Sequence, residues 1–515
     1  MAALNIEENG DGVLMKRSRV LTVLAVALCS ALFCSAAMAK DTLIVADQYD
    51  PTTMDPIGHN DMPSSRVCFE LYDTLVFMGP DGQLVPGLAE KWEFPSPTEY
   101  KFYLRKGVKF HNGDEMKAED VQYTIMRATT DKGAKIKSYS ENVKDVQVID
   151  DYTVVVYLNK PDFSFFSSLT HSWGSIVNKK IAKDCDDTGK VFEPVGTGPF
   201  KFVSWNKNDK YVLERFEDYW GKKAAYKFLE VRSVPEPTAR TVQLEAGDVD
   251  IAFPIVTNDI KRIQENEDLV LYREPQTSIT YMGFNTVKPP FNDVRVRRAI
   301  DAALDTVRIQ KAVWRGVGVT PTSMVPVAIK YSIAKEVEAH KQDTELAKKL
   351  LAEAGVKPGT KFEIWTNERK ERQDMATIIQ AQLKKIGIET EIKVLEWGAY
   401  LNGLVEKKHD MFLLGWVSTV PDPNFALAGL LGTDAGSNYT FFSNKEFDDL
   451  LSQGRMTPDG DARKEIYKNA QLLLNDQRPM VYLHNDESIA GAHKNVKGFV
   501  PSTNEVHSFR NVYFE

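Results

Sequence analysis

A polar loop that follows an apolar run carries residue types suited to a ligand site. The stretch LLGWVSTVPDPNF, residues 413–425, ends its apolar run at Gly415 and Trp416 and then places two prolines around Asp422. Glycine lets another group approach the backbone closely, and tryptophan offers a large apolar wall. The prolines fix the backbone before a ligand arrives. We expect Asp422, the only charge in the loop, either to meet a cationic ligand group or to cap its own turn.

Two further candidate groups follow earlier apolar runs. Arg369 and Arg372 lie in NERKER, directly after KFEIWT at residues 361–366, and could hold a carboxylate through paired hydrogen bonds. Trp397 ends the run ETEIKVLEW at residues 389–397. The structural alternative is that both tryptophans cap the core and that the arginines are solvated.

An alternating series of strands and helices must position these candidates. We expect strands over residues 361–366, 389–397 and 410–416, with helices over 374–387 and 399–408 between them. Such crossovers imply parallel strands, and ligands of open α/β sheets bind outside the carboxyl ends of the strands. The three strand ends should therefore lie on one rim. Upstream, the pattern also predicts a strand over 42–47 and a hairpin over 143–158.

The bulk composition limits the class of protein. A chain of 515 residues exceeds what one hydrophobic core usually supports, so we expect more than one domain. The formal net charge of -8 argues against a nucleic-acid partner, because such partners favour a basic face.

The N-terminus has the pattern of an export signal. A basic segment, residues 16–19, precedes a short apolar run at 20–33 and the A-x-A site that ends at Ala39. The run is too short for a typical membrane span. We therefore predict a signal peptide over residues 1–39, cleaved before Lys40, with either Met1 or Met15 as the start.

The cysteines bear on anchoring and on a disulfide. Cys29 and Cys34 lie in the apolar part of the signal and follow large residues, whereas a lipoprotein signal has a small residue there. We expect release rather than a lipid anchor or an uncleaved one. The mature chain keeps only Cys68 and Cys185. An oxidising compartment permits a disulfide between them, and the alternative is two separate buried thiols.

Many short segments together resemble the extracytoplasmic solute-binding proteins of ABC transporters, in the dipeptide/oligopeptide/nickel-binding family. Each segment is weak alone, but they follow the family's order almost to the C-terminus. They are ELYDTLV (70–76), LVPGLAEKWEF (84–94), YKFYLRKGVKFHNGD (100–114), EDVQYTI (119–125), GTGPFKFVSW (196–205), VLERFEDYWG (212–221), GFNTVKPPFNDVRVRRAIDAALD (283–305), AKKLLAEAG (347–355), LLGWVSTVPDP (413–423) and KNVKGFVPS (494–502).

The resemblance implies an α/β, bilobed, periplasmic-binding-protein-like fold with mixed sheets and a third domain. Domain I would join residues 40–74, 191–273 and 484–515, domain II would be 75–190, and domain III would be 274–483. It also implies a monomer in the periplasm that needs no cofactor. Its lobes would close around a peptide or peptide-like solute, and the closed form would dock on a membrane permease.

The resemblance further implies which residues contact the solute. They are Asn60, Asp61 and Met62 in the loop after the first strand, the aromatic residues Tyr281 and Trp397, and the loop Gly415, Trp416, Val417, Ser418 and Thr419. In many relatives the fifth residue of that last loop is an aspartate that neutralises the α-amine of a peptide. Here it is Thr419, so an amine-binding charge is either moved to Asp422 or Asp61 or absent, which puts a free-amine peptide in doubt.

Two other functions compete with peptide capture. A nickel or other metal chelate, or another non-peptide solute, would be held by arginines, aromatic residues and His484 rather than by a protein metal cage. A lone histidine such as His484 is, however, more often structural. A secreted hydrolase belongs to another class, and the sequence contains no G-x-S-x-G and no H-E-x-x-H motif. We therefore do not expect an enzyme.

Overall fold

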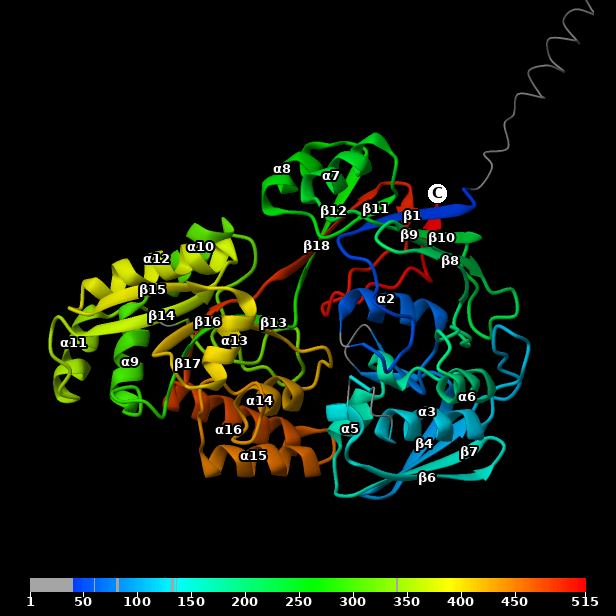
Figure 1. Ribbon diagram of the computed structural model, residues 1–515, viewed down its shortest axis with the longest axis horizontal. Helices are drawn as coiled ribbons and strands as arrows, with labels where there is room; N and C mark the ends of the chain where they lie inside the picture. The colour runs from blue at the N-terminus through cyan, green and yellow to red at the C-terminus, as the bar shows by residue number, and fades with distance from the viewer. Residues whose placement is uncertain (1–39, 60, 80–82, 131–133, 136, 340) are drawn as a thin grey trace, which may run out of the picture.

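The computed structural model describes residues 40–515 apart from 60, 80–82, 131–133, 136 and 340. Figure 1 shows two lobes. The first lobe contains a seven-stranded and a four-stranded sheet, and the second is built around a five-stranded sheet. The predicted export segment, including Ala39, Cys29 and Cys34, lies outside the described residues. Within them, no helix combines the length and the hydropathy needed to cross a membrane.

The seven-stranded sheet is assembled from distant parts of the chain. Its order is β12 (Leu269–Pro275), β18 (Glu487–His493), β11 (Ile251–Ala252), β1 (Thr42–Asp47), β10 (Phe228–Ser233), β9 (Lys210–Arg215) and β8 (Phe200–Asn206). Strand β1 is parallel to β10 and β11, whereas the other pairings are antiparallel. Leu43 and Val45 of β1 pack with Val67 and Leu71 of helix α2 (Met62–Leu71). The sheet joins strands from separate parts of the chain, as a discontinuous first domain requires. The exact limits of this domain stay a prediction.

The four-stranded sheet is antiparallel throughout. Its order is β4 (Ala89–Ser96), β5 (Glu99–Leu104), β7 (Thr153–Leu158) and β6 (Val143–Asp150), so the hairpin predicted over 143–158 is confirmed. Alternate residues of β5 are buried, as expected of a sheet with one covered face. Helix α3 (Ala118–Thr130) covers that face, where Val121 and Ile125 join the same core as Phe102.

The five-stranded sheet forms the centre of the second lobe. Its order is β15 (Glu389–Leu395), β14 (Lys361–Asn367), β16 (Met411–Val417), β13 (Ser278–Phe284) and β17 (Met480–His484). Strand β14 runs parallel to both β15 and β16, so the predicted parallel β-α-β-α-β arrangement is confirmed. Strand β13 pairs antiparallel with β16 and β17, which makes the sheet mixed.

Two boundaries in this unit differ from the prediction. Helix α12 (Lys370–Lys384) begins four positions before the expected residue 374, so Arg372 is helical rather than part of a loop. Helix α13 (Trp397–Val405) begins at Trp397, because Glu396 caps it by accepting a hydrogen bond from the backbone N–H of Ala399 at 3.0 Å. Trp397 therefore opens a helix instead of ending strand β15.

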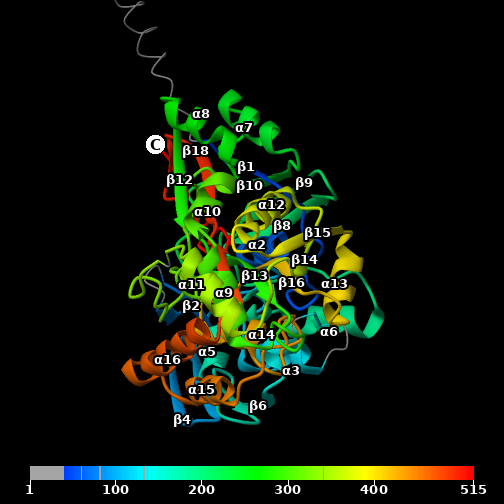
Figure 2. The ribbon, with the colours of Figure 1, turned by 90° about the vertical axis from the view of Figure 1, so that its left-hand side faces the viewer.

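Helices cover both faces of the five-stranded sheet. One face packs against α9 (Val294–Ala303), α11 (Thr344–Glu353) and α12. The other packs against α14 (Pro423–Leu431), α15 (Lys445–Met456) and α16 (Asp461–Gln477), and Figures 1 and 2 both place α15 and α16 at the bottom of this lobe. The remaining elements are β2 (Val76–Met78), β3 (Leu84–Pro86), α4 (Lys137–Ser140), α5 (Ser164–Ser168), η1 (Ser172–Gly174), α6 (Lys179–Thr188), α7 (Pro237–Ala246), η2 (Thr257–Asp259), α8 (Ile260–Glu265), α10 (Thr306–Trp314), β19 (Val496–Lys497) and β20 (Tyr513–Phe514).

Cys68 and Cys185 are both free and buried. The Cys68 sulfur lies 3.8 Å from the carbonyl oxygen of Met54, and burial raises the pKa of this thiol well above its usual range. The Cys185 sulfur lies 3.8 Å from the carbonyl oxygen of Val191. The disulfide alternative is therefore wrong for this structure, because each thiol packs separately in its own surroundings.

Candidate ligand-binding site

The loop after strand β16 lies where the two lobes meet. Tyr139 belongs to α4 of the first lobe. Its hydroxyl oxygen lies 2.6 Å from the hydroxyl oxygen of Thr419. The carbonyl oxygen of Thr419 accepts a hydrogen bond from the side-chain amide of Asn504 at 3.1 Å. Thr277 holds the preceding residue, because its hydroxyl donates to the carbonyl oxygen of Ser418 at 2.7 Å. Contacts to both lobes thus fix the position of this predicted loop.

Asp422 fixes the same loop from within the second lobe. Its carboxylate caps α14 by accepting a hydrogen bond from the backbone N–H of Asn424 at 2.9 Å. The same carboxylate receives two hydrogen bonds from the guanidinium of Arg463, at 2.8 and 3.0 Å. Since its charge is already matched, the geometry favours the loop-fixing role of Asp422 over the role of meeting a ligand cation.

Arg372 is a buried cation at the rim of the sheet. Only 8% of it is exposed, and its guanidinium donates to the side-chain oxygen of Asn367 at 3.0 Å. A Cβ atom added at Gly415 would lie 3.5 Å from the same guanidinium, so Arg372 faces strand β16. Burial lowers the pKa of Arg372. It makes no ion pair within the described part of the chain, which leaves its charge available to an anion.

Arg369 differs from Arg372 although the sequence presents them together. Its side chain is about half exposed and pairs with Glu371 at 3.1 Å. Exposed pairs of this kind contribute little to stability. The solvated interpretation therefore suits Arg369, whereas it does not suit Arg372.

The aromatic candidates occupy different environments. Tyr281 is fully buried, packs edge-on against Phe412 with ring centres 5.9 Å apart, and has a hydroxyl without a hydrogen-bond partner among the described residues. Trp416 is half-buried against α14, and its indole N–H also lacks a partner there. Trp397 is 44% exposed, and Val417 at the end of β16 is also exposed. Trp397 is thus the accessible aromatic residue, and Tyr281 belongs to the core.

The loop after strand β1 lines a pocket of about 320 Å³. Asn60 lies outside the described residues. Asp61 caps helix α2 by accepting a hydrogen bond from the backbone N–H of Ser64 at 2.8 Å, and Met62 begins that helix. Both residues line the pocket, together with Glu505 from the C-terminal segment. Asp61 and Met62, two of the residues expected to contact the solute, therefore lie at a concave surface of the first lobe.

His484 has structural contacts. It is fully buried and stacks on Trp314 with ring centres 3.8 Å apart. Its Nε2 atom lies 2.8 Å from a carboxylate oxygen of Asp486. No group of three or more potential metal ligands occurs among the residues that the structure describes. The geometry of His484 matches the structural role that a lone histidine most often has.

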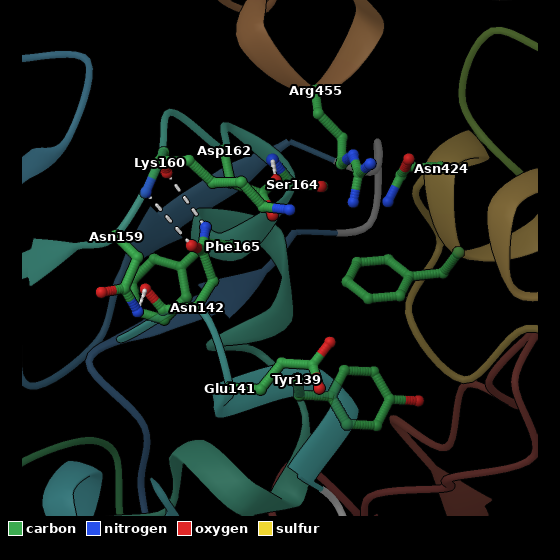
Figure 3. A pocket seen from close by; sticks show the side chains of 11 residues that line it. Tyr139, Glu141, Asn142, Asn159, Lys160, Asp162, Ser164, Phe165, Asn424 and Arg455 are labelled. Carbon is green, nitrogen blue, oxygen red and sulfur yellow. Dashed lines mark hydrogen bonds between the residues drawn. The ribbon is translucent and has the colours of Figure 1, made fainter. Parts of the chain in front are cut away.

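A second pocket, of about 440 Å³, lies between the lobes beside Tyr139 (Figure 3). Asp162 of the first lobe and Asn424 and Arg455 of the second also line it. The backbone N–H of Phe163 donates to the carbonyl oxygen of Arg455 at 2.7 Å and so joins α5 to the end of α15. The sequence analysis missed Tyr139, because no local pattern links it to a loop 280 positions away.

A two-lobed fold with such a loop between the lobes is typical of a solute-binding protein. Residues 83–438 match the family model of bacterial extracellular solute-binding proteins, family 5 Middle, and the chain belongs to this family. Its members are binding proteins rather than enzymes, so the hydrolase alternative is set aside.

Individual relatives cover almost the whole chain. The dipeptide-binding protein of Escherichia coli (strain K12) is 30% identical, and the match covers 93% of this chain and 96% of the relative. Heme-binding protein A of Haemophilus influenzae is 32% identical over 84% of this chain and 85% of its own length. A solved structure of the periplasmic binding protein DppA from Helicobacter pylori, in complex with the peptide STSA, is similar with a TM-score of 0.79 and 30% identity, covering 93% of this chain and 98% of that one.

Proposed function

We propose that the protein captures a peptide or peptide-like solute between its lobes and delivers it to the permease of an ABC importer. The observation that carries this proposal furthest is Arg372, a buried guanidinium at the strand-end rim without a carboxylate partner in the described chain. A buried charge is costly unless it is paired, and the carboxylate of a peptide is a suitable partner. The peptide named with the Helicobacter pylori structure supports the same class of solute.

We infer that the lobes turn about two neighbouring segments. Residues 276–277 connect β12 to β13, and residues 485–486 connect β17 to β18. The segments are tied together, because the backbone N–H of Gln276 donates to the carbonyl oxygen of Asp486 at 2.9 Å. A few residues that change φ and ψ at these points are enough for closure by hinge motion.

The same proposal includes the domain limits given above and a monomeric state. It also includes release into the periplasm after cleavage between Ala39 and Lys40. His484 does not support the alternative of a nickel or other metal chelate, because Trp314 and Asp486 already engage its ring.

A thermal-shift screen of ligand-stripped protein tests the proposal. Di- to tetrapeptides, glutathione and a nickel chelate would be compared under identical conditions. A ligand at one hundred times its Kd should add about 2.7 kcal/mol to the free energy of unfolding. We expect members of the peptide group to raise the melting temperature. Stabilisation by the nickel chelate alone would contradict the proposal.

A further inference from the structure

Four carboxylates near the candidate site already have hydrogen-bond partners. Asp422 pairs with Arg463, Asp61 caps helix α2, Asp486 accepts from Ser278 and lies against His484, and Glu505 accepts a hydrogen bond from Gln276 at 2.6 Å. Burial also raises the pKa of Glu505, which disfavours its charged form. Each of these four carboxylates is therefore already engaged within the protein, and Asp422 has its charge matched by a guanidinium.

Thr419 is occupied as well. Its hydroxyl lies 2.6 Å from that of Tyr139, across the junction of the lobes. The Tyr139 ring stacks on His171 with ring centres 4.8 Å apart and packs against Phe425 at 5.3 Å. Burial lowers the pKa of His171 to about 3, so this ring is neutral at pH 7. The hydroxyl of Thr419 therefore meets an uncharged aromatic group.

Positive charge is available beside the strand that leads into this loop. Arg372 faces Gly415, four positions before Thr419, and its side chain donates only to the neutral amide of Asn367 within the described chain. The Arg372 guanidinium is therefore a buried positive charge at this rim that no carboxylate of the described chain matches. Such a site favours an anionic solute, because a buried ammonium without a carboxylate costs several kcal/mol.

We propose that the solute carries a carboxylate but no free ammonium at the end that approaches Thr419, as in an N-blocked peptide or a comparable peptide-like acid. This inference rests on the proposed function. In this reading the Tyr139–Thr419 contact closes the lobes directly, and a ligand ammonium is not needed to join them. Position 419 thus takes part both in the closure of the lobes and in the choice of solute charge.

Matched peptide pairs test the inference on the ligand-stripped mature protein. Alanine di-, tri- and tetrapeptides with a free N-terminus would be compared by isothermal titration calorimetry with their N-acetyl forms, and each N-acetyl form with its C-terminal amide. We expect N-acetylation to tighten binding at least tenfold at one or more lengths, and amidation of the C-terminus to remove that gain. Equal or tighter binding of the free-amine forms would overturn the inference while leaving peptide capture intact. Failure of every peptide to bind would overturn the proposed function and the inference together.

Two variants at one position separate charge from shape. Thr419→Asp places a carboxylate beside the loop, and Thr419→Asn is a control of similar size without charge. Thr419→Asp should gain at least tenfold in affinity for the free-amine peptide relative to Thr419→Asn, provided that both unfold at similar temperatures. Equal affinities of the two variants for that peptide would contradict the inference, since position 419 would then not sense a ligand charge.

Discussion

The carboxylate of Asp422 and the guanidinium of Arg463 form a two-point ion pair in which the side chains are 4% and 3% exposed. The pair joins the start of helix α14 to helix α16, which packs on the same face of the sheet. It therefore holds the loop between β16 and α14 in one position whether or not a solute is present. The two prolines restrict the same backbone further.

Breaking this pair should destabilise the fold. Asp422→Asn leaves the buried Arg463 charge without its two-point partner, which should lower the free energy of unfolding by about 3–5 kcal/mol. Asp459→Asn is a suitable control, because Asp459 is half exposed and lies 3.9 Å from the same guanidinium. Chemical denaturation measures both variants, and a loss for Asp422→Asn no larger than that for Asp459→Asn would refute the structural role.

The two arginines of the NERKER segment should differ in their effect on binding. Arg372→Met removes a charge-assisted interaction worth about 1.5–3 kcal/mol, so affinity for a peptide carboxylate should fall roughly 10- to 150-fold. Arg369→Met removes an exposed, paired guanidinium and should change affinity less than threefold. Calorimetric titration of both variants is the measurement, and equal losses would show that the burial of Arg372 has no bearing on binding.

His507 should make stability fall as the pH falls. It packs against Phe253 with ring centres 4.5 Å apart, and burial lowers its pKa to about 3. The unfolded chain, with a histidine pKa of about 6.5, binds the proton that the folded chain excludes. The contribution is thus complete above pH 6.5 and decreases below it by about 1.4 kcal/mol per pH unit.

The variant His507→Gln isolates this effect. Between pH 4.5 and 6.5, the free energy of unfolding of the variant should fall less steeply with decreasing pH than that of the unchanged protein. The difference in slope should approach that of one proton, about 1.4 kcal/mol per pH unit. Denaturant titrations across this range give the two slopes. Parallel slopes would mean that His507 is protonated in the folded state.

The mature protein should begin at Lys40 and carry no lipid. This expectation depends on the A-x-A site and on the large residues before Cys29 and Cys34. Intact-mass spectrometry of the exported protein measures it. A diacylated cysteine at either position would show a lipoprotein instead.

Local pattern predicted much of the fold. The parallel unit around β14, β15 and β16 follows from apolar runs that alternate with helical periodicity. The start of α13 was missed, because the cap at Glu396 competes with extension of the strand through Trp397.

The site was less predictable than the fold. Asp422 and Arg463 are 41 positions apart, and Tyr139 and Thr419 are 280 apart. Pairs of this kind depend on how lobes and helices pack, which hydrophobic periodicity does not encode. The sequence likewise does not reveal that Arg372 is buried while Arg369 is solvated, since both lie in the same polar segment.

Small-angle X-ray scattering tests capture between the lobes most directly. Ligand-stripped protein would be measured without solute and again with a saturating concentration of a peptide that passes the thermal-shift screen. Because closure about residues 276–277 and 485–486 brings the lobes together, the radius of gyration should fall when the solute binds. An unchanged radius of gyration, with binding verified by calorimetry on the same sample, would contradict the account.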